Sequence, residues 1–190
     1  FNGSYEGRPQ SLPAGSSVVV ADADDLDLRG SFTLAAWIYP TTPGRGAQSI
    51  LSKHSAAQRS GYELFLAEDG GLGVRLGDGQ HELVATTGSA IPAYERAEKA
   101  YLGDPRRSSM WLLAAATFDA ETGVATVYQL PQTQWPGRRA HGQAQVTSQI
   151  HEIATNDLPL TIAATTAADG SQSRHYNGKI EAPRIYGRAL

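Results

Sequence analysis

The stretch Phe32-Thr-Leu-Ala-Ala-Trp-Ile-Tyr39 decides the fold of this chain. It places apolar side chains on both alternating faces, and Pro40 ends it. A strand of this kind is covered on both sides, so the pattern predicts an interior strand of a sheet. Trp37 lies inside this run and Trp111 inside a similar one, and both tryptophans are therefore predicted to pack in the core.

Further strand patterns extend in both directions from this segment, separated by turn residues such as Asp69-Gly-Gly71. The predicted strands cover residues 16–20, 49–53, 62–67, 72–76, 81–87, 110–118, 124–130, 160–164 and 176–186. Many short strands joined by tight turns are typical of packed sheets. The sequence therefore predicts an all-β fold, a two-sheet antiparallel jelly-roll sandwich.

Two stretches break the strand pattern. Residues 88–109 form the first, and within it residues 93–102 fit about two and a half turns of one short helix. Residues 131–151 form the second, an irregular stretch that contains Trp135. Both are interpreted as insertions in a single domain over residues 1–190, and both chain ends resemble boundaries of a fragment of a larger protein.

Composition excludes several classes of function. The net charge of −3 gives no basic surface for nucleic acid, and no apolar run reaches membrane-spanning length. The absence of cysteine excludes disulfides, thiolate zinc sites and a thiol nucleophile. The compartment stays open, because sandwiches of this size are stable without disulfides and no signal peptide is visible.

Several blocks occur together in an order that resembles laminin-G-like domains of the concanavalin A-like lectin/glucanase type. They are Gly30-Ser-Phe-Thr-Leu-Ala-Ala-Trp-Ile38, Ile50-Leu-Ser-Lys53, Gly61-Tyr-Glu-Leu-Phe-Leu66, Trp111-Leu-Leu-Ala-Ala-Ala-Thr-Phe-Asp119 and the closing Tyr176–Leu190 segment. The resemblance covers nearly the whole chain and implies the jelly-roll fold. It implies little about function, because such sandwiches serve as lectins, adhesion modules, glycosidases and spacers.

The closing segment Asn177-Gly-Lys-Ile-Glu-Ala-Pro-Arg184 departs from the usual pattern of these domains. Pro183 cannot donate a hydrogen bond to a neighbouring strand, so an edge position or a β-bulge is expected there. Three segments resemble the jelly-roll part of the large subunit of N,N-dimethylformamidase-like proteins: this one, Trp37-Ile-Tyr-Pro-Thr-Thr-Pro-Gly-Arg-Gly-Ala-Gln48 and Phe1-Asn-Gly-Ser-Tyr-Glu-Gly-Arg8. That resemblance implies a cytoplasmic protein whose catalytic metal centre lies in another domain.

The acidic loop Asp22-Ala-Asp-Asp-Leu-Asp27 is the strongest candidate metal site, since calcium prefers clustered carboxylate oxygens. An EF-hand frame fails because Ala36 stands where the bidentate carboxylate is needed. A structural calcium held by Asp22 or Asp24 with Glu181 is left as an alternative, and a solvated acidic turn is the favoured interpretation. No metal ligand is therefore assigned.

No catalytic or cofactor-binding residues are predicted. Glu63 and Glu82 stand isolated among apolar neighbours, so the paired carboxylates of a sandwich glycosidase are missing. The 5 histidines lack the spacing of a zinc site. Trp135 fits either a sugar-stacking or docking surface or a loop anchor.

These observations lead to three hypotheses. The favoured one is a non-catalytic accessory domain whose partners are other domains or subunits of a larger protein, an amidase of the N,N-dimethylformamidase type. The alternative is a calcium-assisted module that binds carbohydrate or protein. A glycoside hydrolase is the least favoured.

Overall fold

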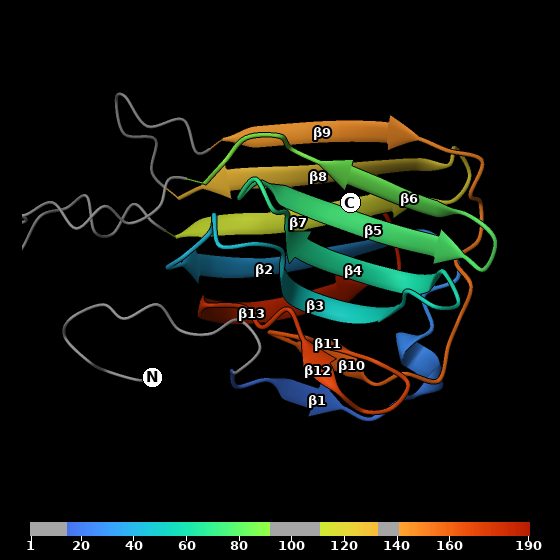
Figure 1. Cartoon of the computed structure of the whole chain (residues 1–190). Coiled ribbons are helices and arrows are strands. Elements are labelled where there is room, and N and C mark those ends of the chain that lie inside the picture. Colours follow the sequence, from blue (N-terminus) through green and yellow to red (C-terminus); the bar gives the residue numbers. More distant parts are fainter. Residues whose placement is uncertain (1–14, 92–110, 133–140) are drawn as a thin grey trace, which may run out of the picture.

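Two antiparallel sheets form the body of the protein, and the computed structural model describes residues 15–91, 111–132 and 141–190 (Figure 1). Sheet A contains, in spatial order, β1 (Val18–Val20), β10 (Leu160–Ile162), β3 (Gln48–Ser55), β4 (Ser60–Leu66), β5 (Leu72–Asp78) and β6 (Glu82–Thr86). Sheet B contains β13 (Gly178–Tyr186), β2 (Phe32–Pro40), β7 (Leu112–Asp119), β8 (Val124–Pro131) and β9 (Gly142–Thr147).

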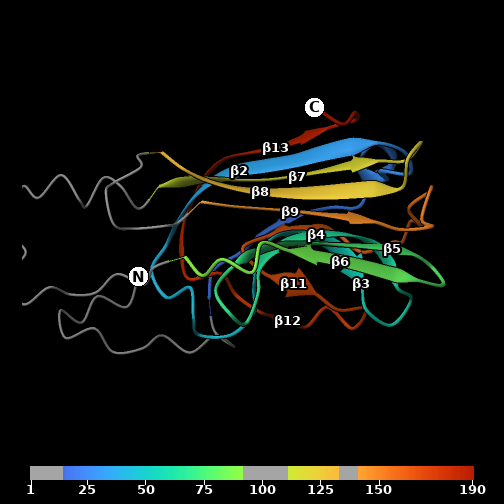
Figure 2. The ribbon, with the colours of Figure 1, turned by 90° about the horizontal axis from the view of Figure 1, so that it is seen from above.

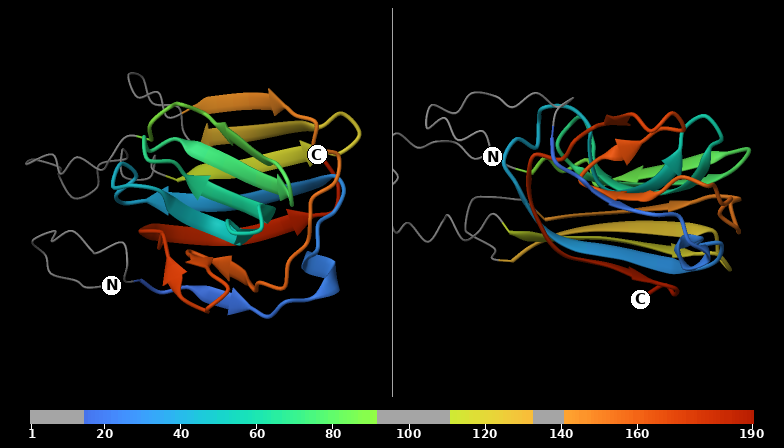
Figure 3. Two further views of the ribbon diagram at one scale, coloured as in Figure 1. Left: turned by 45° about the vertical axis from the view of Figure 1, so that its right-hand side comes forward. Right: turned by 90° about the horizontal axis from the view of Figure 1, so that it is seen from below.

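The two sheets lie face to face, and a small third layer covers the outside of sheet A (Figure 2). This layer is the two-stranded hairpin β11 (Thr165–Thr166) and β12 (Gln172–Ser173), which packs against β3. Within the described residues, no comparable layer covers the outside of sheet B. The C-terminus lies on this side of the protein (Figure 3). The predicted two-sheet jelly-roll sandwich is confirmed, with this asymmetry added.

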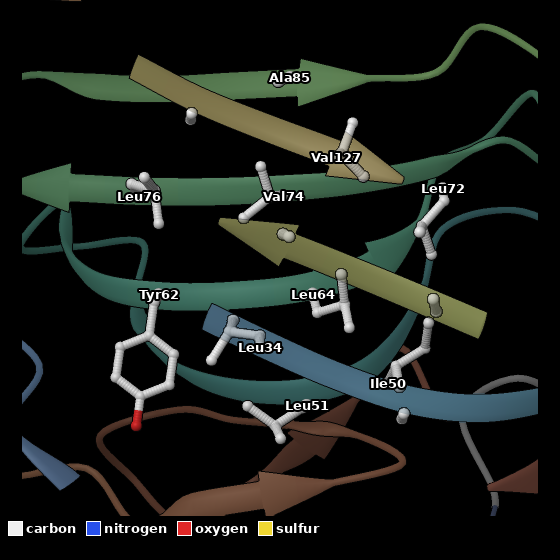
Figure 4. Packing of buried hydrophobic residues seen from close by; sticks show 14 of the residues in the cluster. Leu34, Ile50, Leu51, Tyr62, Leu64, Leu72, Val74, Leu76, Ala85 and Val127 are labelled. Carbon is white, nitrogen blue, oxygen red and sulfur yellow. The ribbon is translucent and has the colours of Figure 1, made fainter. Parts of the chain in front are cut away.

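The core fills the space between the sheets with alternate residues of each strand. Leu34 of β2 and Val127 of β8 face Leu64 and Val74 of sheet A, and all are almost fully buried (Figure 4). At one end the ring of Phe32 lies 5.6 Å from the ring of Tyr62 and 5.8 Å from that of Phe118. Burying a large apolar side chain contributes roughly 1.5–3 kcal/mol, so this shared interior holds the two sheets together.

The prediction for one of the two irregular stretches is wrong. Residues 131–151 were predicted to lack regular structure, but Gly142–Thr147 forms β9, one of the two edge strands of sheet B. The predicted helix at 93–102 and Trp135 lie outside the described residues. Within the described residues, no helix has the length and apolar character needed to cross a membrane.

Candidate functional site

The outer face of sheet B is formed by rows of side chains that run across neighbouring strands. The strand registers place Trp37 beside Leu113 and Leu113 beside Leu130. The next row runs from Arg184 across Ala35 and Ala115 to Tyr128, and the third from Tyr186 across Thr33 to Thr117. Opposite side chains in a sheet lie about 4.5–5.5 Å apart, so each row forms a continuous ridge or valley.

These rows enclose a depression of about 390 Å³ that we call the sheet B hollow. Ala35 and Ala115 form its floor because their side chains are short. The other residues that line the hollow are Ala36, Trp37, Leu113, Leu130, Tyr128, Thr33, Thr117, Ala182, Arg184, Tyr186 and Leu190. The volume falls in the range of roughly 300–1,000 Å³ that is usual for ligand sites.

Trp37 is the most informative residue of the hollow, because it was predicted to pack in the core. That prediction is wrong: 36% of its surface is exposed, on the outer face of β2. The strand is interior to its sheet, as expected, but its outer face is covered only at the end near Thr33, where the C-terminal segment lies, and is open at Trp37. Trp111 is partly buried and meets the ring of Tyr39 edge-on at 5.7 Å.

A β-bulge in β13 brings Arg184 to the hollow. Glu181 pairs with Trp37, whereas Arg184 pairs with Ala35, so one extra residue is accommodated between them. Without that extra residue, Arg184 would point into the sandwich, because side chains alternate between faces. Ala182, one of the residues between Glu181 and Arg184, takes the left-handed conformation with φ of 47°. The edge position and bulge expected at Pro183 are both confirmed.

The outer face of sheet A carries a buried charged cluster instead of an open hollow. Glu63 of β4 is fully buried, and its Oε2 accepts hydrogen bonds from Arg75 Nη1 at 3.2 Å and Arg174 Nη1 at 3.1 Å. Both guanidinium groups lie over the ring of Phe65, at 5.1 and 5.3 Å from its centroid. Arg174 follows β12, so this cluster fastens the covering hairpin to the sheet.

Glu63 and Glu82 are not isolated, contrary to the sequence interpretation. Arg75 lies between them, with its Nη1 3.2 Å from Glu63 Oε2 and its Nε 3.7 Å from Glu82 Oε1. His54 Nε2 lies 3.0 Å from Glu82 Oε1. Both carboxylates are thus engaged by cationic or imidazole groups, and the cluster does not present the open acid and nucleophile of a glycosidase.

Burial lowers the pKa of His54, and the negative charges of Glu63 and Glu82 oppose that change only in part. The unfolded chain therefore binds a proton at His54 near its ordinary pKa of 6.5, while the folded protein resists doing so. We expect stability to fall as the pH drops below about 6.5, and urea denaturation above pH 5 measures it. The variant His54→Gln should lose less stability at low pH. If the free energy of unfolding depends equally on pH in the wild-type protein and the variant, His54 is not the group responsible.

The acidic loop is held by a buried lysine. Lys53 of β3 is 2% exposed, and its Nζ lies 2.6 Å from Asp22 Oδ1 and 3.2 Å from Asp27 Oδ1. The ammonium also donates a hydrogen bond to the carbonyl oxygen of Asn156. The Tyr62 hydroxyl donates to the Leu26 carbonyl oxygen at 2.9 Å, and burial is the main reason that its pKa is raised. The loop is therefore fixed to sheet A.

This arrangement places the residues of the calcium alternative apart from one another. Asp22 contacts Lys53 in sheet A, whereas Glu181 lies opposite Trp37 in sheet B. Asp24 lies in the short 3-10 turn Asp24–Leu26. In residues 15–91, 111–132 and 141–190, no group of three or more acidic or histidine side chains could hold a metal ion.

Sequence reasoning missed the hollow, the charged cluster and the buried lysine. One signal in the sequence pointed to the sheet B hollow. A strand that is apolar on both faces needs something to cover each face. The charged cluster gave no signal in the sequence, because Arg174 is 111 residues from Glu63 along the chain. Lysine is seldom buried, so Lys53 gave no signal at all.

Comparison with known proteins identifies relatives of the whole chain. The sequence profile of the concanavalin A-like lectin/glucanases superfamily matches residues 13–190. The chain is 29% identical to the N,N-dimethylformamidase beta subunit of Alcaligenes sp over 203 residues, which is 100% of the chain and 25% of that subunit. The Paracoccus aminophilus subunit is 29% identical over 202 residues, 100% of the chain and 24% of the subunit.

A solved structure with the same fold is the Ruminococcus gnavus IT-sialidase CBM40 bound to alpha2,3 sialyllactose. It superposes with a TM-score of 0.53 at 17% identity and covers 86% of this chain and 78% of that one. Similarity at this level concerns the fold alone. This chain spans about a quarter of the dimethylformamidase subunits that it matches.

Proposed function

This chain belongs to the concanavalin A-like lectin/glucanases superfamily, and from that premise we propose that it is a non-catalytic interaction domain of a larger, amidase-type polypeptide. In this proposal the sheet B hollow is the surface that contacts the rest of the parent protein. The parent would hydrolyse an amide of the dimethylformamide class, as the names of the relatives indicate.

The observation that carries the proposal is the contrast between the two outer faces. On sheet A the aromatic Phe65 is 3% exposed, and the guanidinium groups of Arg75 and Arg174 lie over its ring. On sheet B the larger Trp37 is 36% exposed beside an apolar floor. Exposed apolar patches with aromatic anchors are typical of protein interfaces. A partner that covers the hollow would bury Trp37, as the two arginines bury Phe65 on sheet A.

The relatives support a partner within the same protein. The whole chain aligns with only a quarter of each dimethylformamidase subunit, so the remaining three-quarters of a similar parent would supply neighbouring surfaces. The charged groups of this domain support a non-catalytic role. Glu63 is paired with arginines, Lys53 with aspartates, and His54 lies against Glu82.

Carbohydrate is the alternative occupant of the hollow. The exposed Trp37 and the neighbouring Tyr128 could stack on sugar rings, as aromatic side chains do in many sugar sites. The wall of Leu113 and Leu130 and the alanine floor favour an apolar protein surface instead, because sugar hydroxyls need hydrogen-bonding partners.

Site-specific crosslinking tests the proposal in the polypeptide that carries this domain. Trp37 is replaced by the photoreactive p-benzoylphenylalanine, and crosslinked peptides are identified by mass spectrometry. We expect crosslinks to residues of the same protein outside this domain. Val84, which is 41% exposed on the outer face of sheet A, is the matched control position and should give few.

Two outcomes would overturn the proposal. The first is an absence of crosslinks from position 37 combined with glycan binding that Trp37→Ala removes, which would favour the carbohydrate alternative. The second is measurable hydrolysis of dimethylformamide by the isolated 190-residue chain, which would make the domain catalytic.

A further inference from the structure

Among the described residues that line the sheet B hollow, one has a charged side chain, and that residue is Arg184. The guanidinium is exposed to solvent, and its Nη1 donates a hydrogen bond to the Tyr186 hydroxyl at 3.3 Å. A guanidinium has five N–H donors, so most of its hydrogen-bonding capacity remains for a ligand. Its planar edge matches a carboxylate in a two-point hydrogen bond.

The other polar groups near Arg184 are uncharged hydroxyls. The Thr33 hydroxyl already donates to the Arg188 carbonyl oxygen at 2.8 Å and accepts from the Leu190 amide at 3.1 Å. The Tyr186 hydroxyl accepts the bond from Arg184 and keeps its own hydrogen as a donor. The guanidinium is therefore the group in this part of the hollow that combines a charge with several hydrogen-bond donors.

Apolar surface lies directly beside this cation. Ala35 is the cross-strand neighbour of Arg184, and Ala115 is the next residue in the same row. Trp37 and Leu113 form the adjacent row. A group that fills the space above the alanines would thus touch apolar walls and, at one end, the guanidinium.

No other charged side chain of β13 forms an ion pair with Arg184. Glu181 lies opposite Trp37, on the other side of the bulge, and does not line the hollow. Lys179 lies over the ring of Tyr39, with its Nζ 5.6 Å from the centroid. No ion pair joins Arg184 to any carboxylate of the described residues.

We propose that the sheet B hollow recognises an apolar group that carries a carboxylate. On the docking surface of the parent polypeptide, this group is an aliphatic or aromatic side chain placed next to an aspartate, a glutamate or a chain-terminal carboxylate. The apolar part lies over Ala35 and Ala115, and the carboxylate accepts hydrogen bonds from Arg184. The inference rests on the proposed function and adds the chemistry of the partner.

A small probe tests this chemistry on the 190-residue chain itself. Amide resonances of the ¹⁵N-labelled protein are followed during titration with 3-phenylpropanoate and with its uncharged analogue 3-phenylpropanamide. We expect saturable shifts at residues of the hollow and about tenfold tighter binding of the acid, because a charge-assisted hydrogen bond is lost in the amide.

Three variants separate the contributions to binding. Arg184→Gln should bind acid and amide equally, and Trp37→Ala should weaken both. Lys179→Gln, which removes a cation from the same strand outside the hollow, should keep the preference for the acid. Thermal melting of each variant verifies that it is folded.

The results distinguish failure of this inference from failure of the proposed function. Equal binding of acid and amide, or a preference for the acid that remains in Arg184→Gln, would overturn the proposed carboxylate recognition. Crosslinks from position 37 would in that case still support the docking role. A preference that depends on Arg184 but occurs without crosslinks would support carboxylate recognition and overturn the docking role.

Discussion

Replacing Lys53 with methionine is expected to lower the free energy of unfolding by about 3 kcal/mol, as measured by urea denaturation. This is the lower end of the range for a broken buried pair, because the side chains of Asp22 and Asp27 are 38% and 25% exposed. Methionine keeps much of the side-chain volume but removes the ammonium. Asp22 and Asp27 would then face each other without a cation, and the carbonyl oxygen of Asn156 would lose its donor. Breaking a buried ion pair from one side leaves an uncompensated charge, which is the reason for the large effect.

Lys179→Met is the matched control, since Lys179 is exposed on β13 and should change stability by less than about 1 kcal/mol. A double variant, Lys53→Met with Asp22→Asn, should recover part of the loss. Because the ammonium lies between the aspartates, millimolar calcium or EDTA should leave the melting temperature of the wild-type protein unchanged. A calcium-dependent rise would show that the loop binds the ion despite Lys53.

Glu63→Gln is expected to lower the free energy of unfolding by about 3 kcal/mol. The substitution preserves shape but leaves the guanidinium groups of Arg75 and Arg174 without their shared carboxylate. We expect the lower end of the range for buried pairs because about a quarter of each arginine side chain reaches solvent. Since Arg174 follows β12, the β11–β12 hairpin should also loosen, and amide hydrogen exchange measures this.

Glu82→Gln is the control on the same face. A third of the Glu82 side chain is exposed, so its pairing with Arg75 should be worth less than about 1 kcal/mol. Equal losses from Glu63→Gln and Glu82→Gln would contradict the central role assigned to Glu63. Unchanged hydrogen exchange in β11 and β12 would contradict the role of the cluster in fastening the hairpin.

The strands of the core could be predicted from the sequence because their inner faces repeat apolar residues with a period of two. The 62–67 and 72–76 predictions correspond to β4 and β5, whose Leu64 and Val74 face the interior. β9 was missed because its sequence, Gly142-Gln-Ala-Gln-Val-Thr147, is short and largely polar. An edge strand with only Ala144 and Val146 packed against the core gives a weak apolar signal.

The candidate site could not be predicted because it depends on what covers each outer face. Trp37 and Phe65 both lie in strands with apolar residues on either face, yet one is exposed and the other buried. The difference comes from Arg75 and Arg174, which lie over Phe65, and Arg174 is remote in sequence from both aromatic residues. Local pattern determines which way a side chain points, but not what lies above it.

The bulge in β13 has a further consequence for how these domains meet in concentrated solution. β13 is an edge strand, and an uninterrupted edge invites strands of other molecules to pair with it and grow into fibrils. The register shift between Glu181 and Arg184, together with Pro183, which lacks an N–H, interrupts such a template midway. Strand pairing between molecules at β13 is therefore unfavourable. Another protein surface can bind the outer face of sheet B without inducing polymerisation through this edge.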